Sequence, residues 1–158
     1  MSRRQPPGIW VTNHLANPIL RPLLRGPAGH RLGRRLALIR YRGRRTGRKY
    51  ELPVQFARDG DRIWILPGSP GHKTWWRNLR GGADVGLLLA GHDARGHATV
   101  IDCTRQPEFT EGLTAYLHAV PQARRALGLP KHTSLSPDAT GLRQISANAV
   151  LVRVDLDD

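Results

Sequence analysis

The chain has 158 residues, enough for one domain with a single core, and 39% hydrophobic with 23% charged residues is a folded rather than a disordered composition. The formal net charge of +13 predicts an anionic partner: nucleic acid, acidic lipid, or a phosphorylated or carboxylated ligand. One cysteine, Cys103, excludes an intramolecular disulfide and a cysteine-based zinc site, and favours a cytoplasmic, reducing compartment.

Residues 1–35 are expected to form a basic amphipathic arm, separate from a main domain at 36–158. We expect no signal peptide, since the N-terminus lacks an apolar core, and no apolar run long enough to span a membrane. Helical spacing appears at four apolar residues of the arm: Ile19, Leu20, Leu23 and Leu24. We interpret the arm as a cap on the core; the alternative is a peripheral contact with the inner face of a membrane.

From residue 36 the pattern changes to alternating strands joined by short turns. Six strands are predicted: LALIRYR, YELPVQFA, RIWILP, DVGLLLA, ARGHATVIDC and ANAVLVRVD. The pair Asp59-Gly60 is a strong hairpin signal, and a further turn is expected at 91–93. Antiparallel neighbours with tight turns predict a mainly β chain with a closed or nearly closed barrel, because closure hides the sheet edges.

Two helical segments should flank this barrel. HKTWWRNLR, at 72–80, predicts one or two turns of helix that end at Gly81-Gly82. Residues 107–127 have the character of a longer helix, with Pro121 expected to kink it. The late helix and the six strands together give an α+β chain dominated by its sheet.

The usual motifs of several enzyme classes are absent from the sequence. It contains no GxSxG, HExxH or GxxxxGK[ST], and its seven histidines are dispersed, so no metal site is expected. No carboxylate pair stands out as a general acid and base. A chain without such groups can still be an enzyme if a cofactor brings the chemistry, which makes a redox cofactor the leading enzyme hypothesis.

The most cationic stretch is GRRTGRKY, at 43–50, between two predicted strands. Gly43 and Gly47 allow close backbone approach, and the N–H groups of such a turn can form an anion-binding nest. Charged and hydroxyl donors surround it: Arg44, Arg45, Thr46, Arg48 and Lys49. The alternative interpretation is a solvated basic hairpin.

A second cluster, LPGSPGHKTWWRNL at 66–79, also follows a predicted strand. Gly68 and Ser69 begin a loop whose amides can face the carbonyls of a ring, and a tryptophan beside it can stack on a planar heterocycle. Adjacent helical residues point about 100° apart, so one of Trp75 and Trp76 should be buried and the other more exposed. The alternative is that either tryptophan is only a core residue.

Together, these two clusters resemble the deazaflavin-dependent nitroreductase family, within the split β-barrel flavin and deazaflavin oxidoreductases. The shared pattern covers residues 36–103: a strand, G-R-[KR]-T-G, a strand, a D-G hairpin, a strand, a Gly-rich loop and W-x-x-N-L. The resemblance implies a split antiparallel β-barrel and hydride transfer from reduced coenzyme F-420 to a quinone, an activated alkene or a nitro compound. The alternatives are an FMN-dependent oxidoreductase on the same barrel and a non-catalytic cofactor- or lipid-binding protein.

The resemblance also assigns residues to the coenzyme. It implies that the phosphate and acidic tail are held by Arg44, Arg45, Thr46, Gly47 and Lys49. The ring is implied to lie against Leu66, Pro67, Gly68 and Ser69, with the following segment contributing Lys73, Trp75, Trp76 and Asn78. Pro70 stands where the family often has a lysine, and Tyr116 is the candidate for a substrate contact. No residue is assigned as a catalytic acid or base.

The partners follow from the same resemblance. A coenzyme tail with a phosphate and glutamates suits the charge of +13 without nucleic acid, and the 6% of aromatic residues gather at one loop rather than along a stacking face. The expected partner is a small redox substrate, and the superfamily implies a homodimer.

Overall fold

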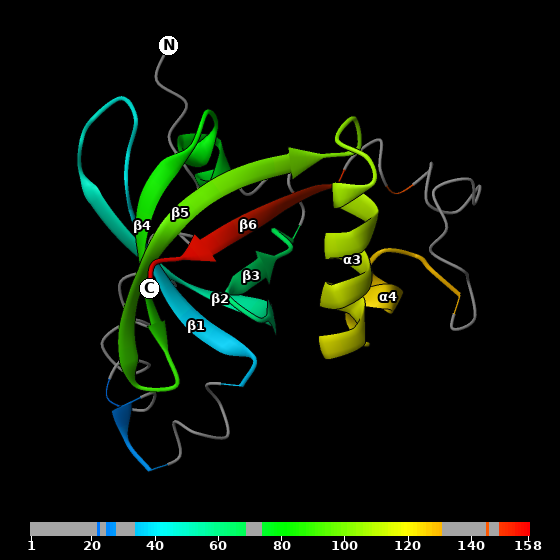
Figure 1. Cartoon of the computed structure of the whole chain (residues 1–158), viewed down its shortest axis with the longest axis horizontal. Coiled ribbons are helices and arrows are strands. Elements are labelled where there is room, and N and C mark those ends of the chain that lie inside the picture. Colours follow the sequence, from blue (N-terminus) through cyan, green and yellow to red (C-terminus); the bar gives the residue numbers. More distant parts are fainter. Residues whose placement is uncertain (1–21, 23–24, 28–33, 69–73, 131–144, 146–148) are drawn as a thin grey trace, which may run out of the picture.

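Six antiparallel strands close into a barrel in the order β1-β2-β3-β6-β5-β4 (Figure 1). The structure is a computed structural model, and it describes residues 22, 25–27, 34–68, 74–130, 145 and 149–158. The strands are β1 (Leu36–Arg42), β2 (Lys49–Asp59), β3 (Arg62–Ile65), β4 (Ala83–Leu89), β5 (His92–Asp102) and β6 (Val150–Leu156). The expected antiparallel barrel of six strands is confirmed. Most of the arm at 1–35 and most of the stretch before β6 lie outside the described residues.

The two hairpin turns differ in how well they were predicted. Gly60 has a φ of 59° in the β2–β3 hairpin, as its Asp-Gly pair indicated. The turn expected at 91–93 is instead a two-residue connection of Ala90 and Gly91, with φ of 48° and 87°. Positive φ at both central residues matches the twist of the flanking strands, so the β4–β5 ladder closes directly with the pair Leu89 and His92.

The barrel interior is filled by alternate residues of its strands. On two neighbouring strands the inward set is Ala37, Ile39 and Tyr41 from β1 and Val85, Leu87 and Leu89 from β4. Trp76 and Leu79 join this cluster from η1 (Trp75–Leu79), a short 3-10 helix where one or two turns of helix were expected. Each fully buried aliphatic side chain contributes roughly 1.5–3 kcal/mol, so this interior is a main source of stability.

A second core lies between the outer face of the sheet and the helix α3 (Glu108–Ala119), which stands beside the barrel in Figure 1. The helix buries one face against outward residues of the strands, among them Trp64 and Ile101. The single helix expected over 107–127 is two helices, since α3 ends before Pro121 and α4 (Ala123–Ala126) follows. Proline cannot donate the next helical hydrogen bond, which explains the break. In the described part of the chain, no helix has the length and apolarity of a membrane span.

Glycine is needed at one helical position, Gly112, where α3 crosses β3. A Cβ added there would lie 2.3 Å from the ring of Trp64, which is fully buried. The helix therefore lies closer to the sheet than any larger residue at this position would allow.

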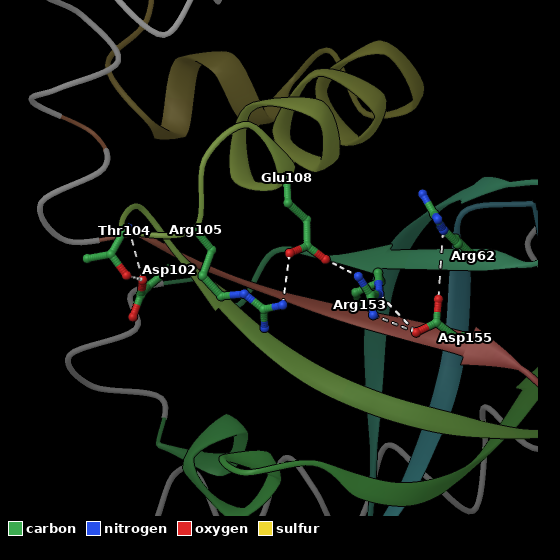
Figure 2. A network of polar contacts seen from close by, with 7 residues as sticks. All are labelled: Arg62, Asp102, Thr104, Arg105, Glu108, Arg153 and Asp155. Carbon is green, nitrogen blue, oxygen red and sulfur yellow. Dashed lines mark hydrogen bonds and ion pairs between the residues drawn. The ribbon is translucent and has the colours of Figure 1, made fainter.

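A chain of ion pairs joins the first turn of α3 to β6 and β3 (Figure 2). Glu108 pairs with Arg105 at 3.0 Å and with Arg153, whose guanidinium also contacts Asp155 at 2.9 Å. Asp155 in turn forms an ion pair with Arg62 at 3.8 Å. Exposed pairs are individually weak, but Arg153 and Glu108 are only 20% and 23% exposed. These ion pairs link the first turn of α3 to β6 and β3, next to the second core.

Candidate functional site

The cationic turn between β1 and β2 is a closed, four-residue loop. The N–H of Gly43 donates to the carbonyl of Arg48, and the N–H of Gly47 donates to the carbonyl of Gly43, each at 2.8 Å. Gly47 has a φ of 65°, and a Cβ at Gly43 would lie 2.9 Å from the hydroxyl oxygen of Thr46 and 3.0 Å from the ring of Tyr50. Both glycines are therefore required by the geometry of the turn.

The tip of this turn presents unused donors. The backbone N–H groups of Arg45 and Thr46 have no partner among the described residues, whereas the N–H of Arg48 is satisfied by the Thr46 hydroxyl oxygen at 3.3 Å. Within the same described part of the chain, the exposed side chains of Arg44 and Arg45 form no ion pair. Two adjacent amides flanked by guanidinium groups suit an anion such as a phosphate.

Asn78 connects this turn to η1, 34 residues further along the chain. Its Oδ1 accepts a hydrogen bond from the N–H of Arg44 at 3.0 Å, and its Nδ2 donates to the carbonyl of Trp75 at 3.0 Å. The half-buried amide thus has a protein partner at each end. The two clusters singled out in the sequence lie side by side at one end of the barrel, and Asn78 holds them together.

Three aromatic rings lie next to the turn. Tyr41 and Tyr50 stack with centroids 5.5 Å apart, and Tyr41 is 6.0 Å from Trp75 in a tilted arrangement. Tyr50 is 41% exposed, which no other large hydrophobic side chain in the described residues matches. Sequence reasoning missed both tyrosines. They pair directly across β1 and β2, and their placement on either side of GRRTG was the available signal.

Residues 21–128 match the F420H(2)-dependent quinone reductase family. The chain belongs to this family. The match covers both clusters, from the cationic turn to η1, and confirms the deazaflavin resemblance of the sequence. No protein with a curated description matches the chain.

Solved structures agree with this membership at the level of the fold. The F420-H2 dependent reductase FDR-A is 14% identical, with a TM-score of 0.52 over 78% of this chain and 95% of that chain. The FAD and heme binding protein from Mycobacterium smegmatis is 17% identical, with a TM-score of 0.52 over 84% and 67%. A structure described as a domain-swapped dimer is 16% identical, with a TM-score of 0.56 over 94% and 99%. At these identities the likeness shows a shared split β-barrel.

The structure describes only part of the loop that the resemblance places beside the coenzyme ring in this quinone reductase family member. Leu66 is half-buried against the second core, Pro67 is buried and Gly68 is exposed, while Ser69 and Lys73 lie outside the described residues. All the assignments along this loop therefore stay predictions.

One of the two tryptophans of η1 is buried and the other is more exposed, as expected from their adjacent positions. Trp76 is buried in the barrel core, and the guanidinium groups of Arg77 and Arg80 lie 5.6 Å and 4.8 Å from its ring centroid. Trp75 is half-buried beside Tyr41. Trp75 is thus the tryptophan that lies beside the aromatic group at the turn, and Trp76 mainly packs the barrel.

Tyr116 lies elsewhere, in the second core under α3, and is 3% exposed. The structure does not bring it together with the cationic turn or with Trp75, which packs against the barrel core. As a substrate contact, Tyr116 stays a prediction with no geometric support. Its hydroxyl belongs to a packed interior.

The described residues also form a hollow away from the cationic turn. A groove of about 1070 Å³ lies around the β4–β5 turn, at the opposite end of β1 from the cationic turn. His92 and His97 are exposed, and His97 contacts Asp84 at 2.9 Å on the outer face of β4 and β5. The described residues contain no cluster of three or more metal-ligating side chains.

Two buried tyrosines predict a loss of stability at alkaline pH. Burial raises the pKa of Tyr41 to about 12, with a smaller contribution from Tyr50, and burial raises the pKa of Tyr116 to about 12. In the unfolded chain a tyrosine titrates near 10, so stabilisation is full below about pH 10 and is lost as the pH rises towards about 12. Denaturant unfolding at stepped pH should show this fall, and Tyr116→Phe should make it shallower. An equally steep fall in Tyr116→Phe would contradict the assignment.

Proposed function

We propose that this chain is an oxidoreductase that transfers a hydride from reduced coenzyme F-420 to a quinone, an activated alkene or a nitro compound. The observation that carries the proposal is the meeting of the cationic turn with Trp75, Tyr41 and Tyr50 at one end of the barrel. Membership in a family described as F420H(2)-dependent supports the choice of coenzyme.

The turn fits the anionic tail of this coenzyme. The unpartnered amides of Arg45 and Thr46 would bind the phosphate, and the side chains of Arg44, Arg45 and Lys49 would neutralise its charge and that of the glutamates. Gly47, with its positive φ and its hydrogen bond to the carbonyl of Gly43, allows the short turn that carries these two adjacent amides.

The aromatic residues would orient the flat ring. Trp75 and Tyr50 offer partly exposed faces beside the turn, and the loop from Leu66 to Ser69, with Lys73 after it, is proposed to line the other edge. The reduced coenzyme supplies the hydride when bound, so the chain need provide no acid, base or metal. The protein has to bind and orient the coenzyme and the substrate, and to exclude water from them. The proposed partner is a small redox substrate rather than nucleic acid, and a homodimer stays a prediction.

A titration with F-420 and with FMN tests the proposal directly. The chain has 4 tryptophans, and Trp75 lies beside the proposed ring site, so intrinsic fluorescence should report binding. We expect F-420 to bind more tightly than FMN, because its longer polyanionic tail reaches more of the cationic turn. Tighter FMN binding would favour the flavin alternative. Reduced F-420 that stays unoxidised with a panel of quinones and nitro compounds would favour a non-catalytic binder.

Asn78 should act on the coenzyme through the turn rather than by contact. Asn78→Leu removes both hydrogen bonds of the amide, so the Arg44 backbone is no longer held against η1. At roughly 0.5–1.5 kcal/mol for each hydrogen bond, F-420 affinity should fall about tenfold. The deazaflavin chromophore without its phosphate tail should bind as before.

The matched control is Thr74→Ala, because Thr74 is exposed just before η1 and its side chain caps nothing. It should leave the affinity for both ligands unchanged. If Asn78→Leu weakens the affinity for both ligands equally, the substitution disrupts the site in general. If the F-420 affinity is unchanged, Asn78 does not position the turn for the coenzyme.

A further inference from the structure

Two guanidinium groups converge on one aromatic side chain of η1. The guanidinium carbon of Arg77 lies 5.6 Å from the centroid of the Trp76 ring, and that of Arg80 lies 4.8 Å from the same ring. The ring is buried in the barrel core, so it gives both cations a fixed support. A guanidinium group over an aromatic face keeps the N–H donors at its edge available for a further partner.

No carboxylate neutralises these two cations within the part of the chain that the structure describes. Arg77 and Arg80 are exposed and form no ion pair there. Hydrogen bonds from Thr104 are the main reason that the pKa of Asp102 lies below its usual value, and Arg105 and Arg80 add to the effect. The Asp102 carboxylate accepts from the amide and the hydroxyl of Thr104 and forms no ion pair with Arg80. Two like charges are thus held together without a counter-charge, and a bound anion would remove their repulsion.

Arg77 and Arg80, here called the η1 pair, lie beside the cationic turn. Asn78, which stands between them in the sequence, accepts a hydrogen bond from the backbone N–H of Arg44 at 3.0 Å. This bond holds η1 against the turn, so both groups of positive charge share one end of the barrel. The turn offers two adjacent amides, which suit one anionic group. A ligand or reaction partner with a second negative group would find the η1 pair next to the first site.

We propose that the η1 pair is a second anion site, which binds a carboxylate of one of the two reactants. A carboxylate matches the fork of a guanidinium group and can accept two parallel hydrogen bonds from it. The identity of the reactant rests on the proposed function, which offers two sources of a carboxylate: the glutamates of the coenzyme tail beyond the phosphate, and an acidic group on the electron acceptor. In either case the η1 pair selects for a reactant with this extra charge, while the turn binds the phosphate.

Titration with glutarate tests the second anion site without the coenzyme. The NMR signals of the arginine Nε–H groups are followed as this dicarboxylate is added, and Arg77→Gln and Arg80→Gln identify the two signals. We expect both signals to shift and to saturate with about millimolar affinity. The shifts should persist when Arg44 and Arg45 are replaced by Ala, because the hydrogen bond that joins the turn to η1 uses the backbone. Shifts that do not saturate, or that are no larger than those of the exposed Arg95, overturn the proposal.

The double variant Arg77→Gln with Arg80→Gln identifies the source of the carboxylate. If the tail is the source, the affinity for F-420 with glutamates should fall by about tenfold, and the affinity for the form without glutamates should not change. If the acceptor is the source, the KM for a carboxylated quinone should rise by about tenfold, and the KM for its neutral analogue should not change. The matched control, Arg95→Gln with Arg125→Gln, also removes two exposed cations and should change these values much less.

The second anion site and the proposed function can fail separately. A wild-type chain that binds glutarate at the η1 pair but binds no form of F-420 contradicts the proposed function and supports the second site. A chain that oxidises reduced F-420 supports the proposed function, and the second site is then overturned if the double variant weakens the binding of all ligands equally or of none.

Discussion

Replacing Arg44 and Arg45 together by Ala should weaken F-420 binding by about a hundredfold or more while the barrel stays folded. Each charge-assisted contact is worth roughly 1.5–3 kcal/mol, and both side chains are exposed with no ion pair among the described residues to replace. Fluorescence titration should give the affinity, and thermal unfolding should give an unchanged midpoint, since surface substitutions of this kind usually change stability little.

A control with the same charge change separates the site from the overall field. Arg95→Ala with Arg125→Ala also removes two exposed cations, on β5 and α4. Both double variants lose two positive charges, so a loss of F-420 affinity that they share reflects long-range electrostatic attraction. If the Arg44 and Arg45 pair costs no more than the control, the turn does not bind the tail.

Trp64→Ala should destabilise the chain by about 3–5 kcal/mol, because a fully buried indole is lost between β3 and α3. Gly112→Ala should cost about 1–3 kcal/mol in the wild-type background, since its Cβ would lie 2.3 Å from that indole. The same change normally stabilises a helix by about 1 kcal/mol, so the sign itself is diagnostic.

Denaturant unfolding of the two single variants and the double variant completes a cycle. In the Trp64→Ala background, Gly112→Ala should leave the free energy of unfolding unchanged or raise it, because the indole that the new methyl group would clash with is absent. Thr114→Ala, on the exposed side of α3, should change stability by less than about 0.5 kcal/mol. If the changes in the free energy of unfolding are additive, α3 can move away from the sheet to accommodate the larger residue, and the close contact does not determine its position.

The sequence predicted the barrel because six short strand-like segments are joined mostly by tight turns. LALIRYR and DVGLLLA place every second residue inside, and the Asp59-Gly60 turn set one register correctly. The β4–β5 turn was harder, because Ala90 adopts a positive φ that alanine rarely takes. The break after α3 was underestimated, since Pro121 both kinks a helix and removes a donor at the same place.

The two clusters of the candidate site could be recognised in the sequence from their residue types, but the contact between them could not. Nothing in WWRNL indicates that Asn78 accepts a hydrogen bond from a turn 34 residues earlier. In the sequence alone Tyr41 and Tyr50 are ordinary strand residues, and only the register of β1 and β2 places them opposite each other. Long-range contacts depend on strand order, which local spacing does not contain.

β1 has β2 on one side and β4 on the other, and the two halves of the site reach it from these two neighbours. The cationic turn is closed by the β1–β2 ladder and by its own hydrogen bonds, independently of the chain between β3 and η1. Natural variation in the length of that chain would therefore change the part of the proposed site that faces the coenzyme ring, while the backbone of the cationic turn keeps its own hydrogen bonds.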